Sequence, residues 1–175
     1  DDYVTTSKIE TVINLNISSS MIGDITGIED FTALEILDFS MNGVGNFDLS
    51  SNVALKELYC ASNGMNGINV AANTNLEILD CSNNFNQTIN VTTNTNLKEL
   101  DAANNGANAI VIGANSLLEV LNVPNNNVST LNISTVVNLT TLNCDTNYNL
   151  NITDFSMLTN LINLNVNSTS LNSID

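Results

Sequence analysis

The chain has 175 residues, enough for one ordinary domain with its own core, and 43% of them are apolar. The chain contains eighteen acidic residues but only three lysines and no histidine, which gives a formal charge of −15. This balance excludes a basic surface of the kind that nucleic acid requires. No apolar run approaches the roughly 20 residues of a spanning helix, so we expect no membrane insertion.

Asparagine occupies 35 positions, and its amide competes with helix hydrogen bonding while favouring turns. Residues 1–11 are expected to form an N-terminal cap segment. From residue 12 to residue 175 the chain repeats, with the last copy incomplete. The pattern Leu-x-x-Leu-x-Φ-x-x-Asn, where Φ is apolar, recurs every 21 residues from Leu34, Leu55, Leu76, Leu97, Leu118 and Leu139. Degenerate copies begin at Val12 and Leu161, each reached by a 22-residue step.

Each copy predicts one short strand of a parallel ladder. The expected strands are Asn14–Ile17, Ile36–Phe39, Glu57–Cys60, Ile78–Cys81, Glu99–Ala102, Val120–Val123, Thr141–Cys144 and Asn163–Val166. A second apolar stretch follows in each unit, as in INVAAN from Ile68 and INVTTN from Ile89. The sequence therefore predicts a coil with two main sides and almost no helix.

The repeated LxxLxCxxN pattern, followed by φxφxxN, resembles leucine-rich-repeat proteins, in particular the bacterial surface and secreted, internalin-like ones. The resemblance covers residues from about Val12 to the end. It implies an α/β-class leucine-rich-repeat solenoid, here almost all β and turn, with about eight repeats of 21–22 residues. It also implies that the strands line a concave face and that the second stretch lies on the convex side. In such proteins the concave face is the usual binding surface.

The closing asparagines of the repeats are expected to form an internal structural ladder, because a buried backbone group left unpaired costs about 1–3 kcal/mol. They are Asn42, Asn63, Asn84, Asn105, Asn126 and Asn147. A second column, Asn52, Asn73, Asn94 and Asn115, is expected to do similar work at the opposite corner.

Cys60, Cys81 and Cys144 occupy the Φ position, where other copies have Phe39 or Ala102. We therefore expect buried, free and unreactive thiols. A disulfide between Cys60 and Cys81 is the alternative, although side chains in line on adjacent strands rarely meet its dihedral requirement.

Outward positions of the predicted strands concentrate carboxylates in the first two thirds of the chain. Together with one tyrosine and two exposed isoleucines they form a candidate patch for a basic peptide, a glycan or a divalent cation. The patch comprises Ile36, Asp38, Glu57, Tyr59, Ile78, Asp80, Glu99 and Asp101. The alternative is a solvated face that keeps the ladder soluble, partly balanced by Lys56 and Lys98.

Catalysis is not expected, because the sequence has no histidine, no GxSxG motif and no phosphate-binding glycine loop. We expect no cofactor and no metal centre. The chain contains no D-x-D-x-D-G calcium loop, so calcium binding is conceivable but is not predicted.

The leading hypothesis is an extracellular or cell-surface recognition or adhesion module that binds a protein or carbohydrate through the concave face. The second is a structural spacer, filament or matrix element that associates end to end through an uncapped solenoid end or continues into further repeats. A weaker third hypothesis is an ice-binding surface built on outward Asn and Thr columns such as Asn90 and Thr92.

Overall fold

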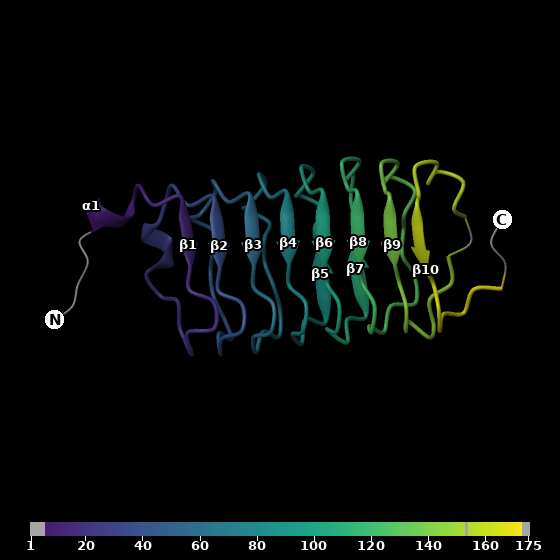
Figure 1. Cartoon of the computed structure of the whole chain (residues 1–175), viewed down its shortest axis with the longest axis horizontal. Coiled ribbons are helices and arrows are strands. Elements are labelled where there is room, and N and C mark those ends of the chain that lie inside the picture. Colours follow the sequence, from purple (N-terminus) through teal and green to yellow (C-terminus); the bar gives the residue numbers. More distant parts are fainter. Residues whose placement is uncertain (1–5, 153, 173–175) are drawn as a thin grey trace.

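The protein is a solenoid of short strands stacked along one axis (Figure 1). The structure is a computed structural model that describes residues 6–152 and 154–172. Within these residues the helical elements are α1 (Thr6–Ile9) and a single 3-10 turn, η1 (Ile28–Asp30). Both are short, so the expectation of almost no helix is confirmed.

Eight parallel strands form the main sheet, in the order β1-β2-β3-β4-β6-β8-β9-β10. They are β1 (Asn14–Asn16), β2 (Ile36–Asp38), β3 (Glu57–Tyr59), β4 (Ile78–Asp80), β6 (Glu99–Asp101), β8 (Val120–Asn122), β9 (Thr141–Asn143) and β10 (Asn163–Asn165). The predicted fold class is confirmed, with about seven turns separating the first strand from the last.

Each strand is one residue shorter than predicted. The Φ residue leaves the strand because the chain starts to turn there, but its N–H still bonds the next turn. The backbone nitrogen of Phe39 donates to the oxygen of Tyr59 over 3.0 Å, and that of Cys60 donates to the oxygen of Asp80 over 2.8 Å. The inter-turn bonding therefore continues beyond the strand.

The 21-residue period sets the register of the sheet. Leu37 pairs with Leu58, Leu58 with Leu79, and Leu79 with Leu100. Neighbouring strands of such a sheet lie about 4.8 Å apart, so one turn is too thin to hold a core of its own. Each turn is stable only because it is stacked on its neighbours.

The second half of the repeat runs along the opposite side of the coil. Two of its segments, β5 (Thr88–Asn90) and β7 (Ala109–Val111), form a separate two-stranded parallel sheet. Elsewhere the second half is extended or turned without strand pairing. We call this side the second-half side, and the side of the eight strands the ladder face.

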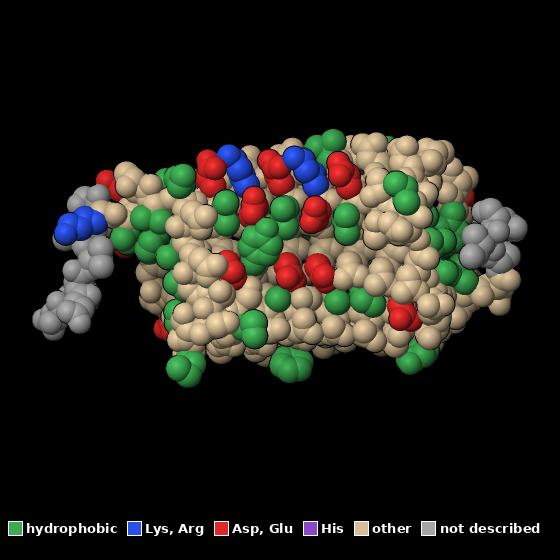
Figure 2. Space-filling view, viewed as in Figure 1, with side chains coloured by type: hydrophobic (Ala, Val, Ile, Leu, Met, Phe, Trp, Pro, Cys, Tyr) green, Lys and Arg blue, Asp and Glu red, His purple; other side chains and the backbone are tan. Residues whose placement is uncertain are grey.

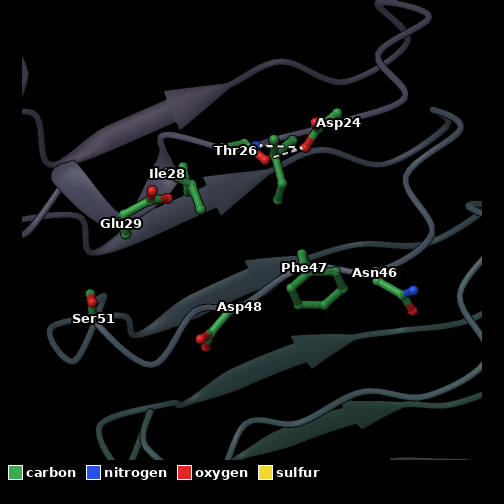
Figure 3. Close-up of a pocket in the computed structure, with 9 residues that line it drawn as sticks. Asp24, Thr26, Ile28, Glu29, Asn46, Phe47, Asp48 and Ser51 are labelled. Carbon is green, nitrogen blue, oxygen red and sulfur yellow. Dashed lines mark hydrogen bonds between the residues drawn. The ribbon is translucent and has the colours of Figure 1, made fainter.

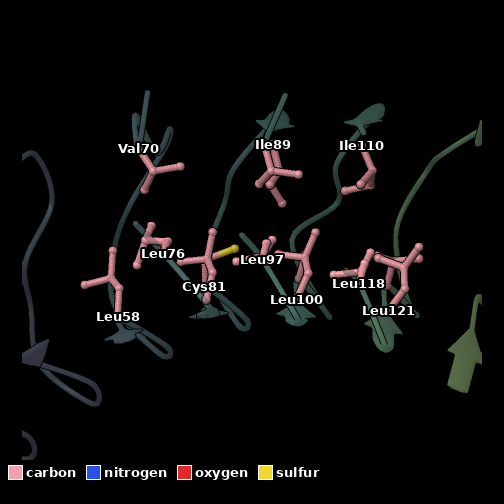
Figure 4. Packing of buried hydrophobic residues seen from close by; sticks show 14 of the residues in the cluster. Leu58, Val70, Leu76, Cys81, Ile89, Leu97, Leu100, Ile110, Leu118 and Leu121 are labelled. Carbon is pink, nitrogen blue, oxygen red and sulfur yellow. The ribbon is translucent and has the colours of Figure 1, made fainter. Parts of the chain in front are cut away.

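The core is a set of columns running along the solenoid between these two sides (Figure 4). Leucines of the ladder, such as Leu76, Leu97 and Leu118, are fully buried. They face second-half residues such as Val70 and Ile89, which are also buried. The two apolar stretches of each unit thus enclose one continuous core.

All three cysteines are free and buried in this core. The Cys60 thiol donates to the backbone oxygen of Asp80 over 3.3 Å. Burial raises the pKa of all three thiols, and that of Cys144 rises to about 12. The thiolate is the reactive form, so these residues behave as small apolar side chains.

The corner after each strand places one residue in the left-handed region of backbone conformation. The residue directly before each closing asparagine has φ near 55°, and none of these residues is glycine. They are Met41, Ser62, Asn83, Asn104, Asn125 and Thr146. Asparagine tolerates this conformation, whereas a β-branched residue is strained in it. Thr146 is the most strained residue of this column.

We predict that Thr146→Asn stabilises the fold by about 0.5–1 kcal/mol, because it relieves this strain. The reverse change at the equivalent exposed corner, Asn125→Thr, should destabilise the fold by a similar amount. Urea denaturation of the two variants measures both effects. Equal midpoints for wild type and both variants would contradict the strain argument.

We also predict that the fold loses stability as the pH rises from about 9 towards 12. An unfolded thiol loses its proton near pH 9, whereas burial keeps the native thiols protonated to higher pH, and a raised native pKa therefore favours the unfolded state in that window. Urea midpoints at about pH 8 and pH 10.5 measure the loss. The triple variant Cys60→Ala, Cys81→Ala, Cys144→Ala should lose clearly less stability between the two pH values. If its loss equals that of wild type, the thiols do not cause it.

Candidate functional site

The structure brings the eight predicted patch residues together on the four adjacent strands β2, β3, β4 and β6. In register, Asp38 lies beside Tyr59, Tyr59 beside Asp80, and Asp80 beside Asp101. A parallel row places Glu57 beside Ile78 and Ile78 beside Glu99. These eight residues, called the acidic patch below, therefore occupy one continuous area of the ladder face.

The isoleucines of the acidic patch are less exposed than the sequence suggested. Ile36 and Ile78 are half-buried. Each lies directly beside Glu57 on a neighbouring strand, at a strand spacing of about 4.8 Å, so outward side chains on adjacent strands are crowded together. The prediction of exposed isoleucines was wrong, because crowding along a parallel ladder covers short outward side chains.

The aspartates of the acidic patch also end the strands. The Oδ1 atom of Asp38 accepts the backbone N–H of Ser40 over 2.9 Å, and Asp80 and Asp101 accept in the same way from the residues two positions on. Asn16 and Asn143 make the same contact in other turns. This local contact needs an acceptor oxygen, which asparagine provides equally well.

Asn122 does not accept from the residue two positions later, because that residue is Pro124, which has no N–H to donate. The Asn122 amide instead donates to Asp101 Oδ2 over 2.8 Å, and its own oxygen accepts from Asn143 over 2.8 Å. A hydrogen-bonded row of side chains therefore connects the acidic patch to the asparagines of β8 and β9.

Tyr59 lies among the carboxylates of the acidic patch. Its hydroxyl donates to Glu57 Oε2 over 2.9 Å. Burial raises its pKa to about 12, assisted by this bond and by the negative charges of Glu57, Glu99 and Asp38. The phenol therefore stays protonated at physiological pH and fixes the orientation of Glu57.

A row of alternating charge borders the acidic patch, as Figure 2 shows along one edge of the ladder face. The row contains Glu35, Lys56, Glu77, Lys98 and Glu119. Lys56 pairs with Glu35 over 2.9 Å, and Lys98 pairs with Glu77 over 2.6 Å. Side-by-side comparison of the residue after each first leucine would have revealed this row, which the sequence reasoning missed.

This pairing changes the charge balance expected for the acidic patch. Each lysine bonds a glutamate of its own row, one strand towards the N-terminus, and not a carboxylate of the patch. Asp38, Glu57, Asp80, Glu99 and Asp101 therefore have no salt-bridge partner among the described residues. The patch is a concentrated negative area.

A shallow hollow of about 370 Å³ opens on the same face, between Tyr59 and Asn143. Asp80, Glu99 and Asp101 line it together with the aliphatic side chains of Ile78 and Val120. The hollow thus combines carboxylates with apolar surface, and it extends from the acidic patch across β8 to β9.

The closing asparagines form the inter-turn contacts expected of an internal ladder. The Asn105 amide nitrogen lies 3.1 Å from the backbone oxygens of Ala102 and Ala103 in its own turn, and 3.1 Å from that of Cys81 in the preceding turn. Its oxygen accepts from the backbone and side-chain nitrogens of Asn86. The same donor pattern recurs at Asn42, Asn63, Asn84, Asn126 and Asn147.

The second asparagine column is buried at the opposite corner. The amide of Asn73 donates to the backbone oxygens of Leu49 and Asn52, both over 3.0 Å. Asn94 and Asn115 repeat this pattern one and two turns later. Both asparagine columns connect successive turns.

A second hollow, of about 400 Å³, lies on the second-half side near the N-terminal end (Figure 3). Its apolar lining is Ile25, Ile28 and Phe47, and its rim includes the carboxylates of Asp24, Glu29 and Asp48. We call it the first-turn hollow. The sequence reasoning did not find it, because it depends on how two turns separate in space.

The described residues contain no group of three or more Asp, Glu, His or Cys side chains that could hold a metal ion. No helix within them is long and apolar enough to cross a membrane. The outward Asn and Thr oxygens of the proposed ice-binding columns also make local bonds, as where Thr92 donates to Asn90.

Solved structures that are similar to this fold include two internalins. The functional domain of InlJ from Listeria monocytogenes, which includes a cysteine ladder, is 29% identical over 97% of this chain, with a TM-score of 0.75. The internalin InlF from the same organism is 24% identical over 99% of the chain, with a TM-score of 0.72. A TDR receptor is 18% identical over 95% of the chain, with a TM-score of 0.77, and shares the fold.

This chain spans 42% of the InlJ structure, 53% of the InlF structure and 32% of the receptor. No protein-family model matches the sequence, and no curated protein matches it significantly.

The strand ladder, the buried leucine columns and these neighbours define a leucine-rich-repeat protein. Within that class the fold is similar to those of the internalins InlJ and InlF along nearly the whole length of this chain.

We predict that Asn105→Ala lowers the free energy of unfolding by about 1–3 kcal/mol, because buried backbone groups of two turns lose their partner. The exposed Asn96 makes a single bond, to the backbone oxygen of Thr74, so Asn96→Ala should cost much less. Urea denaturation of both variants measures the difference. An Asn105→Ala variant that unfolds like wild type would refute the internal-ladder interpretation.

Proposed function

We propose that this chain is a recognition or adhesion module that binds a protein or carbohydrate partner through its ladder face, without catalysing a reaction. The supporting observation is the acidic patch, whose five carboxylates lack salt-bridge partners among the described residues and adjoin a hollow with aliphatic walls. A rigid sheet holds these groups at fixed spacing, which favours binding because little conformational freedom is lost when a partner binds.

The proposal places the chain outside the cell or on its surface. The support is the similarity to internalins and to a receptor, none of which is an enzyme by its description. Because the chain spans only part of these structures, the partner is proposed from the chemistry of the patch. That chemistry fits a protein segment rich in Lys or Arg better than a neutral glycan, since unpaired carboxylates attract cations.

Association through an edge strand is the second candidate. Within the described residues β10 pairs with β9 alone. Ile162, directly before the strand, is 78% exposed, and Leu164, its central residue, is 37% exposed. An unpaired parallel strand with apolar neighbours is a template for pairing with another chain. Concentration-dependent sedimentation would distinguish this function from partner binding by the ladder face.

We predict that the triple variant Asp38→Asn, Asp80→Asn, Asp101→Asn is as stable as wild type or slightly more stable. Asparagine keeps the bond to the backbone N–H two residues on, while repulsion between neighbouring carboxylates, worth a few tenths of a kcal/mol, disappears. Partner binding should weaken and lose most of its salt dependence. Binding is first measured for wild type on a glycan array and a library of displayed peptides, then for the variant against each ligand found.

The matched control is the triple variant Asp24→Asn, Asp48→Asn, Asp154→Asn. It changes the net charge equally and preserves the same kind of local bond, but it lies on the second-half side. It should bind the ladder-face partner like wild type. If the ladder-face variant binds that partner unchanged at low salt, the acidic patch is a solvated surface and the partner contacts another site.

A further inference from the structure

The first-turn hollow lies between two successive turns on the second-half side. Hydrogen bonds connect these turns at both ends of the hollow, and the two backbones separate between those ends. At one end the Gly43 backbone nitrogen donates to the oxygen of Ile22 over 2.8 Å. At the other end the Asn52 amide donates to the oxygen of Ile28 over 2.8 Å. Between these points the described residues contain no hydrogen bond from segment 23–27 to segment 44–51. The middle turns differ, since β5 and β7 pair directly there.

The reason lies in the first turn itself. It has no copy of the φxφxxN stretch, and the 3-10 turn η1 occupies the corresponding region. A 3-10 turn advances less per residue than an extended chain, so it cannot follow the extended segment 46–48 of the next turn. The gap has a volume of about 400 Å³, within the usual size range of small-molecule sites.

The base of the hollow is apolar and includes an aromatic ring. Ile25 and Ile28 are buried below it. The Phe47 ring packs edge-to-face on Phe39, with ring centres 5.2 Å apart. Figure 3 shows Phe47 within the hollow, between Asn46 and Asp48. Phe47 is only half-buried and lines the hollow, so part of its ring surface is accessible to a ligand.

The rim carries three carboxylates, and one oxygen of each accepts a hydrogen bond from a nearby residue. Asp24 Oδ1 accepts from the Thr26 hydroxyl and backbone nitrogen, Asp48 Oδ1 accepts from the Ser50 nitrogen, and Glu29 Oε2 accepts from the Gly27 nitrogen. Those bonds hold the pKa of Asp24 and of Asp48 below the ordinary value. The second oxygen of each has no hydrogen-bond partner among the described residues and remains available to accept from a ligand.

We propose that the first-turn hollow binds a non-acidic pyranose unit of a glycan. A pyranose has an apolar C–H face, which fits the aromatic and aliphatic base, and a rim of hydroxyl donors, which fits fixed carboxylate acceptors. An acidic sugar is excluded by three like charges. This site lies away from the ladder face and does not depend on the function proposed above.

The hollow at the other end of the second-half side provides a comparison. It has a similar volume, about 440 Å³, and lies between Leu131 and Met157. Among the described residues that line it, Asp154 is the only one with a carboxylate and none is aromatic. It therefore lacks the two features that the sugar site requires.

The test uses nuclear magnetic resonance of the ¹⁵N-labelled chain titrated with methyl β-glucopyranoside, methyl β-galactopyranoside and sodium glucuronate. Binding to a single sugar is expected to be weak, with a Kd of about 1 mM. At least one methyl hexoside should give saturable shifts confined to residues 24–29 and 46–51, and glucuronate should give none.

Ser51→Trp blocks the hollow from its rim without touching the core, and it should abolish these shifts. The same substitution at the corresponding corner one turn later, Ala72→Trp, should leave them unchanged, as should the ladder-face triple variant. The proposal is overturned if neither hexoside gives saturable shifts, if glucuronate binds equally well, or if Ser51→Trp binds like wild type.

Discussion

The structure depends on how each turn satisfies the polar backbone groups at its corner. A coil this thin cannot hide a corner within a thick core, so carbonyl and N–H groups of adjacent turns meet inside the molecule with no strand pairing to bond them. The closing asparagine of each turn solves the problem at this corner, because its amide donates and accepts at once. Asn105 contacts the backbone of its own turn and the turn before it, and Asn126 in turn accepts from the Asn105 nitrogen. Shape and stability along the solenoid therefore depend on the same side chain.

Because the turns are stacked, the same kind of residue usually recurs at equivalent positions. Where one turn has a different residue, a nearby side chain replaces the hydrogen bond that is lost. Val111 replaces the Asp or Asn that accepts a backbone N–H in the turns before it, and Asn115 instead turns its oxygen to the Gly113 nitrogen over 2.8 Å. In the turns without this change, the oxygens of Asn52, Asn73 and Asn94 have no partner although they are buried. The residue at position 111 therefore determines the hydrogen bonding of Asn115, four positions later in the same turn.

These relations explain what the sequence could predict. A strict 21-residue period identifies the strands, their register and the closing asparagines, because each is fixed by position within the repeat. The same period placed the acidic patch residues on adjacent strands, although it gave no measure of how far Ile36 and Ile78 would be buried. The first-turn hollow could not be predicted, since it arises where the period fails: η1 replaces the second half of that turn. Features that break the repeat require three-dimensional structure, and they are also where new surface appears.

The lysine positions decide how negative the ladder face is. Had Lys56 and Lys98 bonded Glu57 and Glu99, two of the five carboxylates of the acidic patch would be neutralised and only three would remain uncompensated. Their pairing within the outer row, with Glu35 and Glu77, leaves the inner rows uncompensated at a strand spacing of about 4.8 Å. Exposed pairs of this kind add little to stability, so the outer row acts mainly by keeping the lysines away from the patch. A surface that served solubility alone would be more stable with asparagine in place of Asp80 or Asp101, because the repulsion between these neighbouring carboxylates would disappear.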